Sequence, residues 1–177
     1  MLTSLLKKFP DYDLSTETHK GNMALHLALS SNTETELRKK CVSLLIDRSM
    51  QVNKSNNEGN TPLHFAAQLD LSFLSMIEKK LEEKKFDVYQ EVLRENSNGD
   101  TVFHMAARVG NKSCLEHLFK KERVGEILSK KNKDGQTLLH LSILSGRVEC
   151  VKYLVKKSPK GIFLEQNTQK SCYLQLF

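Results

Sequence analysis

The residues best suited to chemistry in this chain are its six histidines and four cysteines. Histidine acts as an acid, a base or a metal ligand near neutral pH. Zinc sites, however, place two ligands close together, as in C-x2-C or H-E-x-x-H, and neither spacing occurs in this sequence. Four of the histidines recur instead at long, regular intervals: His26, His64, His104 and His140. Such recurrence predicts one packing role repeated four times rather than a metal site.

The cysteines show a similar regularity. Three of them occupy the same place in similar apolar segments: Cys41, Cys114 and Cys150. A small buried hydrophobic residue suits such a position in a helix. Helices in contact lie roughly 8–10 Å apart, which is farther than a disulfide spans, so we predict buried, reduced thiols. Cys172 lies outside this pattern and is the one cysteine that we expect to be reactive.

No other catalytic pattern stands out in the sequence. It contains no glycine-rich phosphate loop, no nucleophile triad and no pair of carboxylates at a catalytic spacing. The composition, with 39% hydrophobic and 27% charged residues, is typical of a globular protein. No apolar run is long enough for a transmembrane helix, and the first residues make a poor signal peptide. These observations predict a protein that is not an enzyme, binds no cofactor and is cytoplasmic or nuclear.

The main signal in the sequence is an internal repeat. Four segments align with one another, at residues 21–28, 59–66, 99–106 and 135–142. Each begins with a glycine, which suits a turn with positive φ. Three of them continue with a threonine that can cap a helix, and Pro62 then occupies a first helical position, where a missing N–H costs nothing. In the first segment Met23 replaces the threonine, so we expect a weaker cap there. Each repeat is thus predicted to begin with a helix of about two turns.

The segment Thr-Pro-Leu-His-Phe-Ala at residues 61–66 carries a resemblance to a known family. It matches the T-P-L-H-x-A core of the ankyrin repeat, whose period is about 33 residues; the other three copies are degenerate. The resemblance covers nearly the whole chain and implies an all-α solenoid of stacked helix pairs with projecting turns. It also implies that the repeated histidines bond to the backbone of the neighbouring turn.

The alignment divides residues 1–177 into the units of one ankyrin-repeat domain. We expect a partial unit at 1–18, repeats at about 19–56, 57–96, 97–132 and 133–166, and a partial unit at 167–177. The first repeat has five extra residues near 33–37, and residues 78–96 predict an extended second helix with an added turn. Because both ends fall inside a repeat, we expect a piece of a longer array.

The resemblance further implies a binding groove formed by the turn tips and the first helices. The predicted partner-binding residues are Asn57, Glu58, Asn60, Gln68, Leu69, Ser97, Asn98, Asp100, Arg108, Val109, Lys133, Asp134, Gln136, Leu144 and Ser145. The first repeat adds His19, Lys20, Asn22, Ser30 and Ser31. Within this set, Leu69, Val109 and Leu144 are expected to give the groove an apolar strip.

The sequence therefore predicts a non-catalytic module or scaffold that binds another protein through the groove. Two other functions stay open: an inhibitor of Rel-type transcription factors, and the cytosolic repeat domain of a channel or other membrane-attached protein. The net charge of +6 disfavours the first of these. Basic pairs at the ends of second helices, such as Lys79-Lys80 and Lys156-Lys157, leave room for a weaker alternative, a basic edge that contacts nucleic acid or anionic lipid.

Overall fold

The computed structural model describes residues 14–48, 51–120 and 124–158. Within these ranges the chain forms ten helices and no strands. The helices are α2 (Ala24–Ser30), α3 (Thr35–Arg48), α4 (Pro62–Ala66), α5 (Leu71–Glu83), α6 (Val88–Leu93), α7 (Val102–Val109), α8 (Lys112–Leu118), α9 (Val124–Ser129), α10 (Leu138–Leu144) and α11 (Val148–Lys157). Cys172 and the predicted partial unit at 167–177 lie outside the described residues, as do the first 13 residues of the unit predicted at 1–18.

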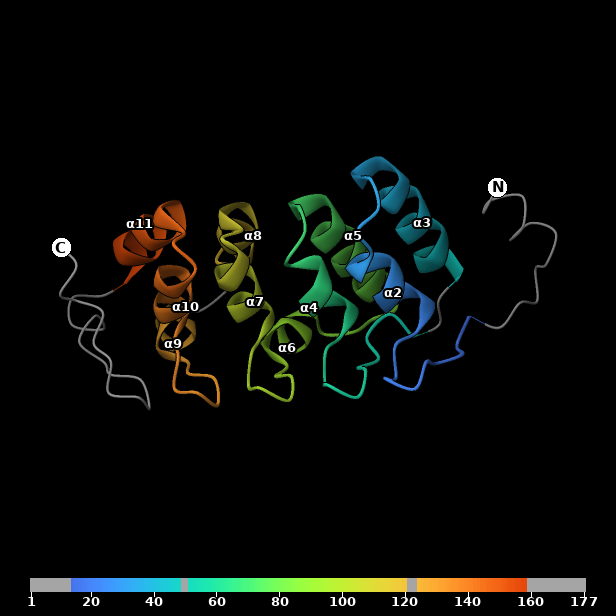
Figure 1. Ribbon diagram of the computed structural model, residues 1–177, viewed down its shortest axis with the longest axis horizontal. Coiled ribbons are helices and arrows are strands. Elements are labelled where there is room, and N and C mark those ends of the chain that lie inside the picture. The colour runs from blue at the N-terminus through green and yellow to red at the C-terminus, as the bar shows by residue number, and fades with distance from the viewer. Residues whose placement is uncertain (1–13, 49–50, 121–123, 159–177) are drawn as a thin grey trace.

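The helices stack in pairs, as Figure 1 shows. The pairs are α2–α3, α4–α5, α7–α8 and α10–α11, and the two members of each pair pack against each other. First helices contact first helices along the row, and second helices contact second helices. The turns that lead into the first helices project from the same side of the stack (Figure 1). This arrangement confirms the predicted all-α solenoid.

The first helices begin as the repeated motif predicts. Thr61, Thr101 and Thr137 are the N-cap residues, and a histidine three residues later completes a capping box with each of them. The histidine Nδ1 takes the place that a Glu or Gln oxygen has in the usual box, because it accepts a hydrogen bond from the N-cap N–H. Pro62 is the first residue of α4. The Met23 side chain has no hydroxyl group, so the histidine supplies the polar bond at this N-cap. His26 Nδ1 lies 3.1 Å from the Met23 nitrogen.

The ends of the first helices differ from one repeat to the next. Gly110 closes α7 with φ 76°, the left-handed conformation that glycine adopts without strain. Asn32 and Asp70 lie six residues after His26 and His64, as Gly110 lies six after His104, and they belong to the residue types that best tolerate this conformation. Neither adopts it, because Lys85 is the only non-glycine residue with positive φ in the described chain. Asp70 instead has φ −76° and is the N-cap of α5, where its carboxylate accepts a hydrogen bond from the Ser72 N–H.

The two predicted insertions lengthen second helices. Helix α3 has 14 residues and α5 has 13, against 7 in α8. Helix α6 follows α5, which confirms the added turn expected within residues 78–96. The third repeat contains a comparable short helix, α9, which the sequence reading missed. Ile127 and Leu128 of α9 are buried, so this helix adds apolar contacts between the third and fourth pairs.

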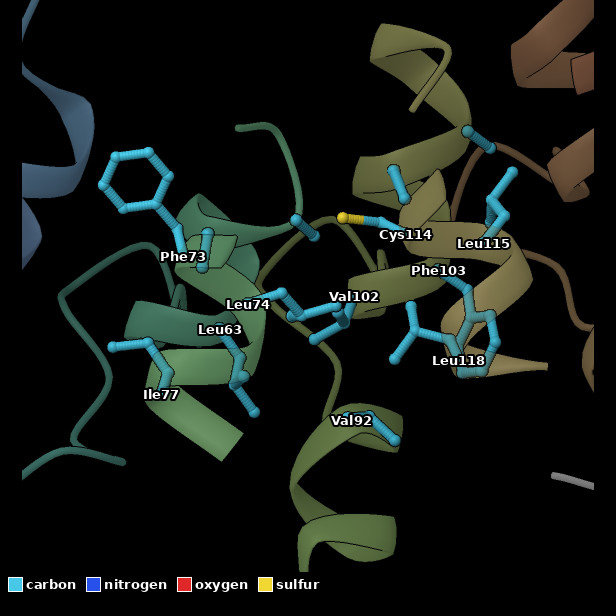
Figure 2. Close-up of a cluster of buried hydrophobic side chains, with 14 of the residues drawn as sticks. Leu63, Phe73, Leu74, Ile77, Val92, Val102, Phe103, Cys114, Leu115 and Leu118 are labelled. Carbon is cyan, nitrogen blue, oxygen red and sulfur yellow. The ribbon is translucent and has the colours of Figure 1, made fainter. Parts of the chain in front are cut away.

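The core runs between the helix pairs along the stack. Figure 2 shows Leu63 and Leu74 on one side and Phe103 and Leu118 on the other, with Val102 between them. All five side chains are buried. Farther along, an aromatic series joins the third pair to the fourth: the Phe103 and Phe119 ring centroids lie 5.1 Å apart, and those of Phe119 and Tyr153 lie 6.1 Å apart. Each pair thus depends on its neighbours for burial, as in other solenoids.

The three described cysteines are free thiols in the second helices. Cys114 and Cys150 are buried as predicted, but Cys41 is only half-buried, so the prediction of three buried thiols is wrong at this position. Helix α3 packs against α5 on one side, and among the described residues no further second helix packs on its other side. Burial raises the pKa of the Cys150 thiol and raises that of Cys114 to about 12.

We expect Cys41 to react with a maleimide faster than Cys114 and Cys150 in the native protein at neutral pH. The thiolate is the reactive form, and burial suppresses both its formation and its access to reagent at the other two sites. Peptide mass spectrometry after timed labelling would measure the three rates, with urea-denatured protein as the control in which all three should react. Equal native rates at Cys41 and Cys150 would contradict this expectation.

Candidate interaction surface

Three of the four projecting turns are built around an asparagine to which the sequence analysis assigns no role, and Thr18 occupies the equivalent place in the first turn. In the turn before α7 the Asn96 Oδ1 accepts hydrogen bonds from the backbone N–H groups of Asn98 and Asp100, both at 2.9 Å. Asn56 and Asn132 make the same pair of bonds in the turns before α4 and α10. These asparagines satisfy backbone donors that would otherwise need water, and they fix the shape of all three turns.

The same asparagines join each turn to the one before it. The Nδ2 group of Asn56 donates to Asn22, that of Asn96 donates to Asn60, and that of Asn132 donates to Asp100, each at 2.8 Å. Backbone bonds run in parallel, since the N–H of Ser97 donates to the carbonyl of Glu58 and that of Lys133 to the carbonyl of Asn98. We call this series of side-chain and backbone bonds the turn ladder. It holds the four turns in a fixed relation to one another.

The turn ladder changes the assignment of two predicted site residues. Asn60 and Asp100 are only 8% and 1% exposed, so the expectation that they lie on the surface for a partner is wrong. Their side-chain oxygens accept the bonds from Asn96 and Asn132. Asp100 also holds Arg108, with Nη2 2.5 Å from Oδ2. The buried Asp100 carboxylate therefore has a partner on each oxygen, Asn132 on Oδ1 and Arg108 on Oδ2.

The tips of the turns remain open to solvent. Six predicted site residues are exposed there: Asn57, Glu58, Ser97, Asn98, Lys133 and Asp134. His19 and Lys20 are exposed at the equivalent place in the first repeat. On and beside the first helices, Arg108 and Leu144 are exposed, while Gln68, Leu69, Val109, Gln136 and Ser145 are half-buried. The tips thus present different side chains on closely similar backbones.

The expected apolar strip has a different composition from the one predicted. Counted from the capping threonines, Leu144 falls at the position of Arg108, and Ser145 falls at that of Val109. Leu144 is 51% exposed but is not in line with Leu69 and Val109.

Three apolar residues missing from the predicted set do belong to the first helices. Leu27, Phe65 and Met105 each follow a repeated histidine, and all are exposed or half-buried. Met105 and Val109 lie four residues apart in α7 and so share one face. The sequence indicates these residues, because an apolar residue directly follows each repeated histidine.

The repeated histidines use both ring nitrogens within the fold. Their Nδ1 atoms complete the capping boxes, and the Nε2 atoms of His26, His64 and His104 lie 3.1–3.3 Å from the backbone carbonyls of Lys54, Asp100 and Lys130 in the following turn. These bonds confirm the backbone role that the resemblance implied. Burial lowers the pKa of His64 to about 4 and also lowers that of His26 and His104, so all three rings are neutral at pH 7.

One further histidine joins neighbouring second helices. His117 in α8 lies 2.6 Å from the buried carboxylate of Glu78 in α5, measured between Nε2 and Oε2. In the described parts of the chain, no group of three or more His, Cys, Asp or Glu side chains is placed to hold a metal ion. The contact between His117 and Glu78 therefore joins α8 to α5, and so the third repeat to the second.

The repeated turns, helix pairs and histidine bonds agree with a comparison against protein-family models. A model of ankyrin repeats in three copies matches residues 1–78 and 73–168. The chain belongs to the ankyrin repeat family. Ankyrin repeats are generally protein–protein interaction modules. The comparison with curated proteins found no match. No helix in the described ranges is both long and apolar enough to cross a membrane.

Proposed function

We propose that this ankyrin stack is a non-catalytic module that binds a partner protein through its turn tips and first helices. The observation that carries the proposal is the contrast between backbone and side chains at the tips. Asn56, Asn96 and Asn132 fix three turns with the same hydrogen bonds, yet the exposed side chains differ from turn to turn. A repeated scaffold with varied exposed residues suits recognition.

The energetics of binding favour such a surface. A turn that is already ordered loses little conformational entropy when a partner docks, so more of the contact energy appears as affinity. Leu27, Phe65 and Met105 supply exposed or half-buried apolar area on the first helices, and central apolar anchors carry most of the energy in protein interfaces. The polar tips would form the rim around them.

A combined substitution at three exposed positions should abolish binding. We choose Asn98→Arg, Lys133→Glu and Leu144→Asp, because these side chains lie at two tips and at the end of α10. Arg108 is left intact because it pairs with the buried Asp100. Hot-spot losses of 2 kcal/mol or more weaken binding by roughly 30-fold, whereas each exposed substitution should change stability by only about 0.5 kcal/mol. Quantitative affinity capture from cell lysate would identify proteins retained by the wild type and lost by this variant.

The matched control reverses three exposed lysines in or directly after the second helices, with Lys79, Lys120 and Lys156 each changed to Glu. We expect this variant to retain the partners that the tip variant loses. If the lysine variant loses them and the tip variant keeps them, the basic edge is the binding surface and the proposal fails. Thermal melts of both variants would show that each is folded.

A further inference from the structure

The turn before α7 contains a dipeptide that can react with itself. In each of the four turns one residue directly precedes the glycine with positive φ, and these residues are Lys20, Glu58, Asn98 and Asp134. Asn98–Gly99 is the one Asn–Gly pair in the sequence. The Gly99 nitrogen can attack the carbonyl of the Asn98 side chain and close a five-membered ring, an intramolecular step between adjacent groups. Glycine has no side chain to hinder this attack, whereas lysine has no side-chain carbonyl and a carboxylate is a poorer electrophile than an amide.

The products of this reaction follow from its atom balance. The Gly99 nitrogen forms a bond to Cγ of Asn98 and gives up its proton, while the Cγ–Nδ2 bond breaks and the amide takes that proton and leaves as ammonia. Water then opens the resulting succinimide ring at one of its two carbonyls. Cleavage of the bond to Cγ gives aspartate. Cleavage of the bond to the main-chain carbonyl carbon gives isoaspartate, in which the main chain runs through Cβ and Cγ and is longer by one methylene.

Hydrogen bonds of the folded turn oppose ring closure. The Gly99 N–H donates to the Asn96 carbonyl at 2.9 Å, so the proton that must leave is held in place. The Asn98 carbonyl accepts from the Lys133 N–H, also at 2.9 Å, and the Asn98 N–H donates to the Asn96 Oδ1. The Asn98 side chain is exposed, so access of water is not the barrier. The backbone is fixed on both sides of the pair, and the ring therefore closes only after the turn opens locally.

The isoaspartate form does not fit the folded turn. Gly99 is buried and has φ 73°, and a Cβ atom added to it would lie 2.9 Å from the Lys133 nitrogen. The backbone therefore has no space for another carbon at this point. The Asn96 Oδ1 accepts from the N–H groups of both Asn98 and Asp100. Because the added methylene lies between these two donors, the one oxygen no longer reaches both of them.

We propose that Asn98–Gly99 is a site of spontaneous deamidation and isomerisation, and that the turn ladder suppresses this modification in the folded chain. Isomerisation follows a local opening of the turn and breaks the bonds between the turns before α7 and α10. The added methylene then prevents these bonds from forming again, so the change is permanent. The amount of isoaspartate at position 98 therefore reports how often this turn has opened.

The suppression is measured by ageing the full 177-residue chain at mildly alkaline pH, in native buffer and in guanidinium chloride. Peptide mass spectrometry should find that Asn98 converts more slowly in the native chain, on the order of tenfold or more. Asn57 is an exposed asparagine of the turn before α4 that precedes Glu58, and it should convert slowly in both samples. Asn98→Gln, whose longer side chain does not form the five-membered ring, should stay unmodified. Equal rates at Asn98 in the two samples, or no conversion in the denatured one, would overturn the proposal.

Hydrogen-exchange mass spectrometry measures the effect on the turn ladder. The chain with isoaspartate at position 98 is purified from the denatured sample, refolded and compared with Asn98→Asp, which adds the same charge without the methylene. The amides of residues 96–100 and 132–136 should exchange on the order of tenfold faster in the isoaspartate chain, with α4 unchanged. Failure of this chain to refold, when Asn98→Gln refolds after the same treatment, also supports the proposal. Turn amides that exchange within about twofold of Asn98→Asp would show that the ladder tolerates the methylene, which contradicts the proposal.

Discussion

Replacing Asn96 by alanine is expected to lower the free energy of unfolding by about 2–4 kcal/mol. The side chain accepts from the N–H groups of Asn98 and Asp100 and donates to the Oδ1 of Asn60. Asn96, Asp100 and Asn60 are all buried, so alanine would leave one backbone donor and one amide oxygen without partners and away from water. Urea denaturation of the wild type and the variant would measure the difference.

Asn98→Ala is the matched control for this prediction. It removes the same side chain two residues away, at an exposed tip, and should change stability by no more than about 0.5 kcal/mol. A loss at Asn96 no larger than the loss at Asn98 would show that water replaces the turn ladder at little cost. A large loss at both positions would indicate that the tip has packing interactions of its own.

The regular parts of this fold were predictable because the same packing problem recurs in every repeat. A glycine with positive φ and a histidine that completes the cap are needed wherever a turn enters a first helix, and the spacing of Gly59 and His64 recurs at Gly99 and His104. The turn asparagines recur in three of the four turns, each three residues before such a glycine, as in Asn96 and Gly99, and Thr18 takes this place before Gly21. They were missed because an asparagine in a polar turn resembles an ordinary surface residue, and only its two N–H bonds show its role.

The candidate site was harder to predict because a place in a projecting turn does not imply exposure. The family resemblance implied that Asn60 and Asp100 lie in the groove, yet both are buried. What they share is a side-chain oxygen that can accept the bond from the next turn. Exposure also depends on the adjoining repeats: Leu27 is 46% exposed and Leu141 is 2% exposed in the same slot after the histidine. A single repeat therefore does not determine which of its apolar residues reach the surface.

The stability of the fold is expected to fall as the pH is lowered from 7 to 5. Burial lowers the pKa of His64 from 6.5 to about 4 in the folded chain, whereas an unfolded histidine titrates near its ordinary value of about 6.5. Between pH 6.5 and pH 4 the unfolded chain binds a proton at His64 that the folded chain does not bind. Unfolding therefore becomes more favourable as the pH falls. The His64 contribution is therefore fully present above pH 6.5 and decreases progressively below it. At pH 5 the loss from His64 alone is about 2 kcal/mol.

Urea denaturation at pH 7 and pH 5 measures this effect, and two variants assign it. Burial lowers the pKa of His26 and His104 as well, so the wild type should lose more stability between the two pH values than His64 alone explains. His64→Gln removes one titrating group and is expected to reduce the pH-dependent loss by about 2 kcal/mol, even though the variant is less stable at pH 7. His19→Gln removes an exposed histidine and should leave the loss unchanged. If His64→Gln retains the full wild-type difference between pH 7 and pH 5, the buried capping histidines do not cause the acid sensitivity, and titration of carboxylates in the stack must account for it.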